Sequence, residues 1–263
     1  MHFVVKETFS NIPFWHRRFL RQAEWTRELR FPLYRKLEIA RAGRILELGC
    51  GTGVIAAELA GRTLSEIHAV DRDPDLIAFA QREYEGLHLS WHAAEAVELP
   101  FPDGSFDLIV THYFWMWAAS PLDILRECKR VLAPGGRVAA LCEPDYSGRR
   151  DEPRELSEIY KLTRDNLIAS GADPDAGPKL RGLFETAGFR TESGIMEFAW
   201  DNERHKEEFG NEWSMIEATI GASDILREMK IKEQGAIAAG RRSSVMPVHW
   251  CLGTRKSTDN SLT

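Results

Sequence analysis

The segment from residue 44 to residue 60, RILELGCGTGVIAAELA, constrains the fold more than any other part of this chain. Residues 45–48 are mostly apolar and make a short run of the kind that forms a strand buried on both faces. Apolar residues recur at helical spacing after a glycine-rich turn. The turn has glycines at three alternate positions: Gly49, Gly51 and Gly53. A strand, a glycine turn and a helix in this order bring backbone close to a ligand at the carboxyl end of a strand. The segment therefore predicts an α/β fold with a ligand site at this turn.

The spacing of these glycines, G-x-G-x-G, is one residue tighter than the dinucleotide fingerprint G-x-G-x-x-G. Glu47 lies two residues before the first glycine. A negative group beside the turn suits a cationic ligand better than a pyrophosphate, which binds bare amides at a helix N-terminus. The segment thus favours a cationic cofactor, and a nicotinamide oxidoreductase remains as a rival that would use the same fold.

The phrase ELGCGTG at 47–53 resembles motif I of class I S-adenosylmethionine-dependent methyltransferases, whose cofactor carries an ammonium and a sulfonium. Further phrases resemble the same family in the same order: VDRDP, LPF followed by FDLIV, and LAPGGRV. The resemblance covers about 44–253 and is strongest over 44–143. It implies S-adenosyl-L-methionine as cofactor and a Rossmann-like, doubly wound sheet of seven mostly parallel strands with an antiparallel last strand. The implied reaction is methyl transfer to a small-molecule acceptor by in-line displacement.

The resemblance also assigns cofactor-binding residues. Asp71 ends a predicted strand, where its carboxylate would accept hydrogen bonds from the ribose hydroxyls, and Arg72 would lie alongside the adenine. Glu95, at a position where the family often has aspartate, would accept from the adenine amino group, and the Ala96 amide would donate to a ring nitrogen. Alternatively, Asp71 caps the next helix, a role otherwise left to Asp73, and Glu95 is a solvated carboxylate. The full predicted cofactor set is Trp25, Glu47, Gly49, Cys50, Gly51, Gly53, Asp71, Arg72, Glu95, Ala96 and Thr111.

An aromatic run, HYFWMW at 112–117, follows the predicted fourth strand. These side chains could line a site for the sulfonium and for an apolar or aromatic substrate. Alternatively, they could pack between the sheet and the next helix. Methyl transfer mainly needs alignment and exclusion of water, and a base only if the acceptor begins protonated. The predicted catalytic residues are His112, Glu143 and Tyr146. His112 is favoured as base because its ordinary pKa lies nearest neutrality; its alternative is a structural histidine satisfied by backbone.

The rest of the pattern divides the chain into a cap, a core domain and a tail. Residues 1–43 are predicted as an N-terminal helical cap, in which Pro32 separates a helix at 11–30 from a second at 33–40. Residues 44–253 are predicted as the methyltransferase domain, and 254–263 as a flexible tail. Helical insertions are expected at 146–187 and 202–240. The predicted strands are 45–48, 66–71, 87–92, 106–111, 137–142, 189–200 and 245–253.

Basic residues gather in the segment 11–44. It holds nine basic and three acidic residues, hence +6, whereas the whole chain has a net charge of −6. Such a segment could face an acidic substrate, an RNA or the acidic body of its own domain. The overall acidity makes nucleic acid an unlikely partner in this interpretation. An RNA or protein methyltransferase therefore stays an alternative, as does a non-catalytic methyltransferase-like partner protein.

The four cysteines form no C-x-x-C pair and stand near no histidines at zinc spacing. We therefore expect buried thiols in a reducing compartment and no metal site. The sequence shows neither a signal segment nor an apolar run of membrane-spanning length, so a cytoplasmic protein away from membranes is expected. The acceptor is expected to be a small molecule of apolar or aromatic character. Its identity and the oligomeric state stay open.

Overall fold

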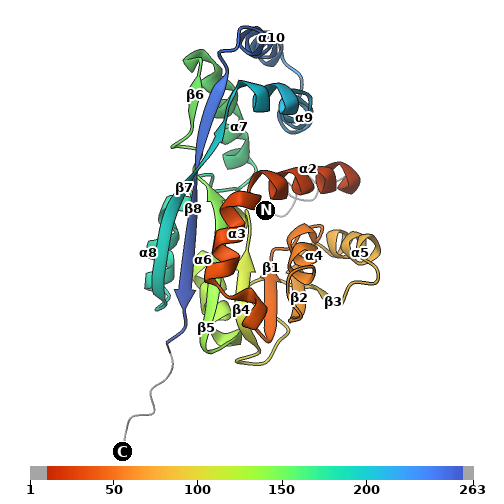
Figure 1. Cartoon of the computed structure of the whole chain (residues 1–263), viewed down its shortest axis with the longest axis vertical. Coiled ribbons are helices and arrows are strands. Elements are labelled where there is room, and N and C mark those ends of the chain that lie inside the picture. Colours follow the sequence, from red (N-terminus) through yellow and green to blue (C-terminus); the bar gives the residue numbers. More distant parts are fainter. Residues whose placement is uncertain (1–10, 257–263) are drawn as a thin grey trace, which may run out of the picture.

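The computed structural model describes residues 11–256, which are organised around one mixed sheet (Figure 1). The strand order is β3-β2-β1-β4-β5-β8-β6, and β7 pairs with β8 off this path. Strands β1 to β5 are parallel, and β8 is antiparallel to β5, β6 and β7. The strands are β1 Arg44–Leu48, β2 Glu66–Asp71, β3 Leu89–Ala93, β4 Phe106–Thr111, β5 Leu132–Pro144, β6 Arg150–Glu152, β7 Arg190–Trp200 and β8 Ser243–Thr254. The Rossmann-like, mostly parallel sheet with an antiparallel last strand is confirmed.

Two features of the sheet differ from the prediction. The short strand β6 was not predicted, and it pairs with the first residues of β8, beyond the part that β5 reaches. Strand β5 begins at Leu132, five residues before the predicted start at Arg137. The LAPGG phrase lies before that predicted start, but Leu132 pairs with Phe106 of β4, and the carbonyl of Gly136 accepts a hydrogen bond from the amide of Arg255 at 2.8 Å. Partners on both sides therefore keep this segment extended.

Helices cover both faces of the sheet, as a doubly wound fold requires. The helices are α2 Ile12–Trp25, α3 Arg27–Lys36, α4 Val54–Ala60, α5 Pro74–Glu83, α6 Pro121–Val131, α7 Ser157–Ala169, α8 Leu180–Thr186, α9 Asn202–Ile220 and α10 Asp224–Ala238, with 3₁₀ turns η1 Ile39–Arg41, η2 Trp115–Trp117, η3 Arg154–Leu156 and η4 Gly177–Lys179. Along β4, Ile109 packs in the core shared with α6 and α8, whereas Leu108 and Val110 pack in the core shared with α3 and α4. This alternation buries the strand on both faces.

The N-terminal pair of helices is broken at Thr26, and the predicted break at Pro32 is wrong. Pro32 lies inside α3. Thr26 is fully buried, its hydroxyl donates to the carbonyl of Gln22 at 2.8 Å, and it accepts from Nη1 of Arg30 at 2.6 Å. These buried contacts set the break, whereas Pro32 merely lacks one amide donor of the helix ladder.

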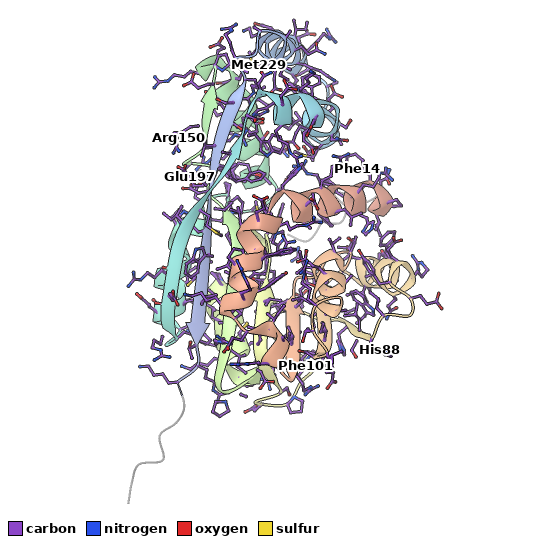
Figure 2. All side chains as sticks on the ribbon, in the orientation of Figure 1. Phe14, His88, Phe101, Arg150, Glu197 and Met229 are labelled. Carbon is purple, nitrogen blue, oxygen red and sulfur yellow. The ribbon has the colours of Figure 1, made fainter. Side chains whose placement is uncertain are left out.

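Strands β7 and β8 extend past strands β1 to β5 and carry a second lobe (Figure 1). Helices α7, α9 and α10 pack there around the buried Trp213. Figure 2 labels Met229 in this lobe and Phe101 in the lobe that holds β1 to β5. The insertion expected at 202–240 is two helices, separated at Gly221 with φ +88°. In the insertion expected at 146–187, the first α-helix begins at Ser157, since residues 150–152 form β6.

Parts of the predicted cap and tail, residues 1–10 and 257–263, lie outside the described residues. Within 11–256, no helix combines the length and the apolar character needed to cross a membrane.

Candidate active site

The glycine turn after β1 has the left-handed backbone that glycine tolerates best. Gly49, Gly51 and Gly53 have φ values of +74°, +52° and +82°. A Cβ on Gly49 would collide with the ring of Phe114, and a Cβ on Gly53 with the ring of Trp91. Both the backbone angle and the close approach of an aromatic ring therefore require glycine at these two positions.

Asp71, at the end of β2, faces the same turn. Its Oδ2 accepts from the Gly51 amide at 2.8 Å and its Oδ1 accepts from the Asp73 amide at 3.0 Å, which leaves each oxygen with further acceptor capacity. Burial raises the pKa of Asp71. The cap of α5 is Asp73, whose side chain accepts from the amides of Asp75 and Leu76. The alternative in which Asp71 is the helix cap is therefore wrong.

Glu47 is a buried carboxylate at the base of the turn. It is 2% exposed, and its Oε2 has no hydrogen-bond partner among the residues that the structure describes. Burial raises the pKa of Glu47 well above its ordinary value, and the nearby charge of Asp71 raises it further. A cation placed beside Glu47 would favour the ionised form.

The segment predicted to face adenine lies next to Asp71, because the amide of Ala94 donates to the Asp71 carbonyl at 3.0 Å. Glu95 is exposed and Ala96 is half-buried; Arg72, which follows Asp71, is exposed as well. Most of the predicted cofactor residues are thus brought together around one turn, and Cys50 lies buried within it.

Helix α2 covers this turn. The Nδ1 of His16 lies 2.9 Å from the hydroxyl oxygen of Thr52. A Cβ on Gly51 would be in ordinary contact with the Phe19 ring, at 3.4 Å. The cap therefore packs directly on the glycine turn.

His112 is anchored to the cap and is a poorer base than predicted. Its Nε2 lies 2.9 Å from the hydroxyl oxygen of Thr26. Burial, and then the charge of Arg30, lower the pKa of His112 well below its ordinary value. Arg30 is fully buried and binds both carboxylate oxygens of Glu58, at 2.9 and 2.6 Å. A protonated His112 would lie close to the fixed positive charge of Arg30. The geometry therefore favours a structural role for His112, whose partner is the Thr26 hydroxyl and not a backbone group.

Glu143 and Thr111 both hold the aromatic segment that follows β4. Glu143 is fully buried, and its Oε1 accepts from the Phe114 amide at 2.8 Å. Burial raises the pKa of Glu143 to about 7, although neighbouring backbone amides oppose the shift. The Thr111 hydroxyl accepts from Nε1 of Trp115 at 2.9 Å. Within this segment Tyr113 has φ +52°, a left-handed conformation that is costly for a residue with a side chain.

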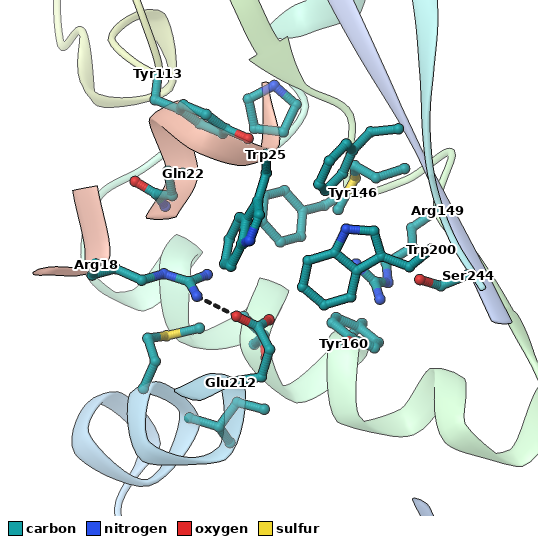
Figure 3. Close-up of a pocket in the computed structure, with 16 residues that line it drawn as sticks. Arg18, Gln22, Trp25, Tyr113, Tyr146, Arg149, Tyr160, Trp200, Glu212 and Ser244 are labelled. Carbon is teal, nitrogen blue, oxygen red and sulfur yellow. Dashed lines mark hydrogen bonds and ion pairs between the residues drawn. The ribbon is translucent and has the colours of Figure 1, made fainter. Parts of the chain in front are cut away.

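A cavity of about 650 Å³, part of it open to solvent, lies between α2, the ends of β4 and β5, and the second lobe (Figure 3). Six aromatic side chains line it: Trp25, Tyr113, Tyr146, Tyr160, Phe198 and Trp200. The remaining lining residues are Arg18, Gln22, Pro144, Arg149, Thr163, Glu212, Met215, Ile216, Ser244 and Met246.

Among the predicted site residues, Trp25 and Tyr146 line this cavity. Trp25 was predicted to bind the cofactor, but its ring packs edge-on against Trp200 at 5.0 Å, and its Nε1 donates to Glu208 at 3.2 Å. The position of Trp25 off the apolar stripe of its helix signalled a second contact surface. The lining residues from β7, α7 and α9 gave no comparable signal, because nothing in their local pattern relates them to the glycine turn.

The basic N-terminal segment pairs with acidic residues of the same chain. Arg18 forms an ion pair with Glu212, and Arg21 with Glu208 at 2.9 Å, both across to α9. Arg30 likewise pairs with Glu58. For Arg18, Arg21 and Arg30, the expectation that the basic segment faces acidic residues of its own chain is therefore confirmed.

The four cysteines are free and buried, as expected. Over residues 11–256, no group of three or more histidine, cysteine, aspartate or glutamate side chains is arranged to hold a metal ion.

Residues 46–140 match a family model described as "Methyltransferase domain". The chain is 41% identical over 101 residues to a demethylmenaquinone methyltransferase of Thermus thermophilus, covering 37% of this chain and 46% of the relative. It is 35% identical over 104 residues to a malonyl-[acyl-carrier protein] O-methyltransferase of a Marinomonas species, covering 39% of this chain and 38% of the relative. The matches thus span about half or less of these relatives' own length.

Solved structures share the fold over most of the chain. The YcgJ protein of Bacillus subtilis superposes with a TM-score of 0.56 at 18% identity, covering 85% of this chain and 97% of that one. Phosphoethanolamine N-methyltransferase 2 of Haemonchus contortus, in complex with S-adenosyl-L-methionine, gives a TM-score of 0.52 at 18% identity, covering 81% of this chain and 48% of that one. At these identities the likeness concerns the fold alone.

Proposed function

We propose that the chain transfers a methyl group from S-adenosyl-L-methionine to a small molecule bound in the aromatic cavity; the match of residues 46–140 to a methyltransferase-domain model supports this. One observation carries the proposal: the glycine turn with Asp71 and the aromatic cavity both lie at the carboxyl edge of the parallel strands, against the same helix α2. Ligands of open α/β sheets bind at this edge.

The residues at the turn fit the proposed cofactor. Both oxygens of Asp71 keep acceptor capacity for the ribose hydroxyls. Glu47 has a buried oxygen without a described partner, which suits a positively charged ligand. Glu95 and Ala96 would hold the adenine, with Arg72 alongside. Bound there, S-adenosyl-L-methionine would supply a methyl group on a sulfonium, which is already a good leaving group.

The catalytic work left to the chain is then alignment and exclusion of water. Helix α2 packs over the turn through His16, and the segment held by Glu143 places Phe114 against Gly49. Tyr146 lines the cavity, and burial raises the pKa of its hydroxyl, so that it stays protonated near neutral pH. Its role in this proposal is to donate a hydrogen bond to the acceptor and hold it in place.

The acceptor is inferred from the cavity and not from the relatives. Of the sixteen residues that line the cavity, Tyr113 alone falls within the segment 46–140 that matches the family model. The names of the relatives also imply different acceptors. Six aromatic rings around one cavity favour a flat apolar or aromatic body.

The test is a calorimetric titration with S-adenosylhomocysteine, the demethylated form of the cofactor. Wild-type protein should bind it, and Asp71→Ala should bind at least about 100-fold more weakly, because two hydrogen bonds to a charged group are lost. Asp75→Ala is the matched control: Asp75 is an exposed acid four residues further on, in the first turn of α5, and its loss should leave the affinity unchanged.

Circular dichroism of Asp71→Ala must show an intact fold, since this carboxylate also holds the amide of Gly51. Absence of heat with wild-type protein would refute the cofactor assignment. Unchanged affinity in folded Asp71→Ala would refute the ribose assignment alone.

A further inference from the structure

Arg149 lines the aromatic cavity, and one nitrogen of its guanidinium has no hydrogen-bond partner among the described residues. Its Nε and Nη2 donate to the two oxygens of Asp151, at 3.0 and 3.2 Å. Its Cζ lies 3.1 Å from the ring centre of Tyr160. These contacts fix the plane of the group and leave Nη1, with two N–H donors, without a hydrogen-bond partner among residues 11–256.

The Nη1 group also remains accessible. The side chain of Arg149 is 11% exposed, and it is one of the cavity-lining residues. Among the described residues, a few side-chain polar atoms are buried from solvent and also lack a hydrogen-bond partner, for example Nε1 of Trp200. Nη1 of Arg149 is not one of these buried atoms, although it too lacks a partner. Arginine carries no acceptor, so these donors can be satisfied only by a hydrogen-bond acceptor that enters the cavity.

Arg149 shares its carboxylate partner with a second arginine. Asp151 accepts from Nη2 of Arg242 at 2.8 Å as well, so that one carboxylate is shared between two guanidinium groups. Glu233 pairs with Arg242 at 2.7 Å on its far side. Two arginines and two carboxylates make up this network, and within it Nη1 of the cavity-lining Arg149 has no hydrogen-bond partner among residues 11–256.

The opposite side of the cavity is already satisfied within the protein. Arg18 forms an ion pair with Glu212 and lies 4.4 Å from the ring centre of Trp25 (Figure 3). A carboxylate beside an aromatic ring could attract a cationic ligand, but here the protein's own guanidinium occupies that place. Glu212 is therefore already paired within the protein, whereas Arg149 keeps a pair of N–H donors without a partner among residues 11–256.

Between these two sides lie the aromatic walls. The rings of Trp25 and Trp200 are 5.0 Å apart, and those of Phe198 and Trp200 are 5.7 Å apart. The hydroxyls of Tyr146 and Tyr160, which line the same cavity, have no hydrogen-bond partner in the described chain. These rings contact one another and form a continuous aromatic surface, against which a flat apolar ring can pack. The two hydroxyls can donate or accept hydrogen bonds at the same cavity.

We propose that the methyl acceptor is an aromatic acid, whose ring lies between the aromatic side chains and whose carboxylate binds the Nη1 group of Arg149. This inference rests on the proposed function, since it takes the cavity to be the acceptor site. Arg149 is a specificity-determining residue here: it selects and orients the acceptor and takes no part in the transfer itself.

The test compares three probes of one size and three charges: 2-naphthoate, 2-naphthamide and 2-naphthylmethylammonium. Each is titrated into wild-type protein saturated with S-adenosylhomocysteine, and binding is followed by tryptophan fluorescence. A charge-assisted hydrogen bond predicts that naphthoate binds about 10- to 100-fold more tightly than naphthamide. Equal affinities, or tightest binding of the ammonium probe, would overturn the proposal. This comparison needs no variant, so it decides the matter even if a substitution unfolds the protein.

The variant Arg149→Met should reduce the preference for naphthoate to about twofold or less, since it removes the donors and keeps an unbranched apolar side chain. Arg150→Gln is the matched control, because Arg150 is the adjacent arginine, exposed and paired with Glu197 at 2.7 Å (Figure 2). It should keep the full preference. A folded Arg149→Met protein that still prefers naphthoate would also overturn the proposal. Binding of S-adenosylhomocysteine is measured first and alone, so that failure of the cofactor site is recognised separately.

Discussion

Replacing Glu143 with glutamine should flatten the pH dependence of stability. Glu143 is fully buried and binds the Phe114 amide through one oxygen, while its other oxygen has no partner in the described structure. Its pKa is raised from 4.5 to about 7, so the folded state holds the proton more tightly than the unfolded state does. The stability that the protonated form contributes is therefore complete below pH 4.5 and is lost as the pH rises through about 7.

The size of the effect follows from that shift. A rise from 4.5 to about 7 corresponds to about 3 kcal/mol at 1.36 kcal/mol per pKa unit. No discount for solvent screening applies, because the side chain is fully buried. A glutamine oxygen can still accept from the Phe114 amide, but the amide nitrogen would be a buried donor without a partner, at a cost of about 1–3 kcal/mol at every pH. The prediction thus concerns how stability changes with pH. Between pH 4.5 and pH 8, the free energy of unfolding of Glu143→Gln should rise by about 3 kcal/mol relative to that of wild type.

The assay is urea unfolding at half-unit steps from pH 4.5 to 8.5, followed by both circular dichroism and tryptophan fluorescence. The difference in free energy of unfolding between variant and wild type isolates Glu143 from other groups that titrate in the same window. Glu192→Gln is the control, because Glu192 is an exposed acid whose loss should leave the slope unchanged. A difference between Glu143→Gln and wild type that stays constant with pH would refute the reasoning.

Three further substitutions test other parts of the structure by urea unfolding at pH 7. Arg30→Met should lower the free energy of unfolding by about 3–5 kcal/mol, because it leaves the carboxylate of Glu58 unpaired; adding Glu58→Gln should restore part of the loss, and no restoration would contradict the pairing. Gly53→Ala should cost about 2–4 kcal/mol, from the left-handed backbone at φ +82° and the collision with Trp91; a neutral effect would rule out that backbone. His16→Ala should cost about 1–2 kcal/mol through its lost contact with the glycine turn, and an unchanged midpoint would mean that the cap does not rest on the turn.

The sheet could be predicted from the sequence because its signals are local. The apolar run at 106–111 forms β4 as predicted, and the acid-ended run at 66–71 forms β2. The glycines of the turn also needed no tertiary knowledge, since a left-handed backbone favours glycine whatever surrounds it. Asp73 could be assigned as the α5 cap because capping depends on residues two and three positions away.

The parts that could not be predicted depend on contacts between residues distant in sequence. The break at Thr26 is set by a buried network that includes Arg30 and His112, whereas the local rule pointed to Pro32. The same network lowers the pKa of His112, so ordinary pKa values were a poor guide to its role. The aromatic cavity draws its walls from both ends of the chain, and Arg149 lies in a segment without any motif.

Helix α2 touches both ligand sites of this proposal: His16 lies on the glycine turn, and Trp25, at the other end of the helix, lines the cavity. A shared wall of this kind imposes heterotropic linkage. If one ligand displaces the helix on binding, it changes the affinity of the protein for the other ligand by some factor. Thermodynamic reciprocity requires the second ligand to change the affinity for the first by the same factor. The coupling free energy between donor and acceptor would then be set by one fourteen-residue helix.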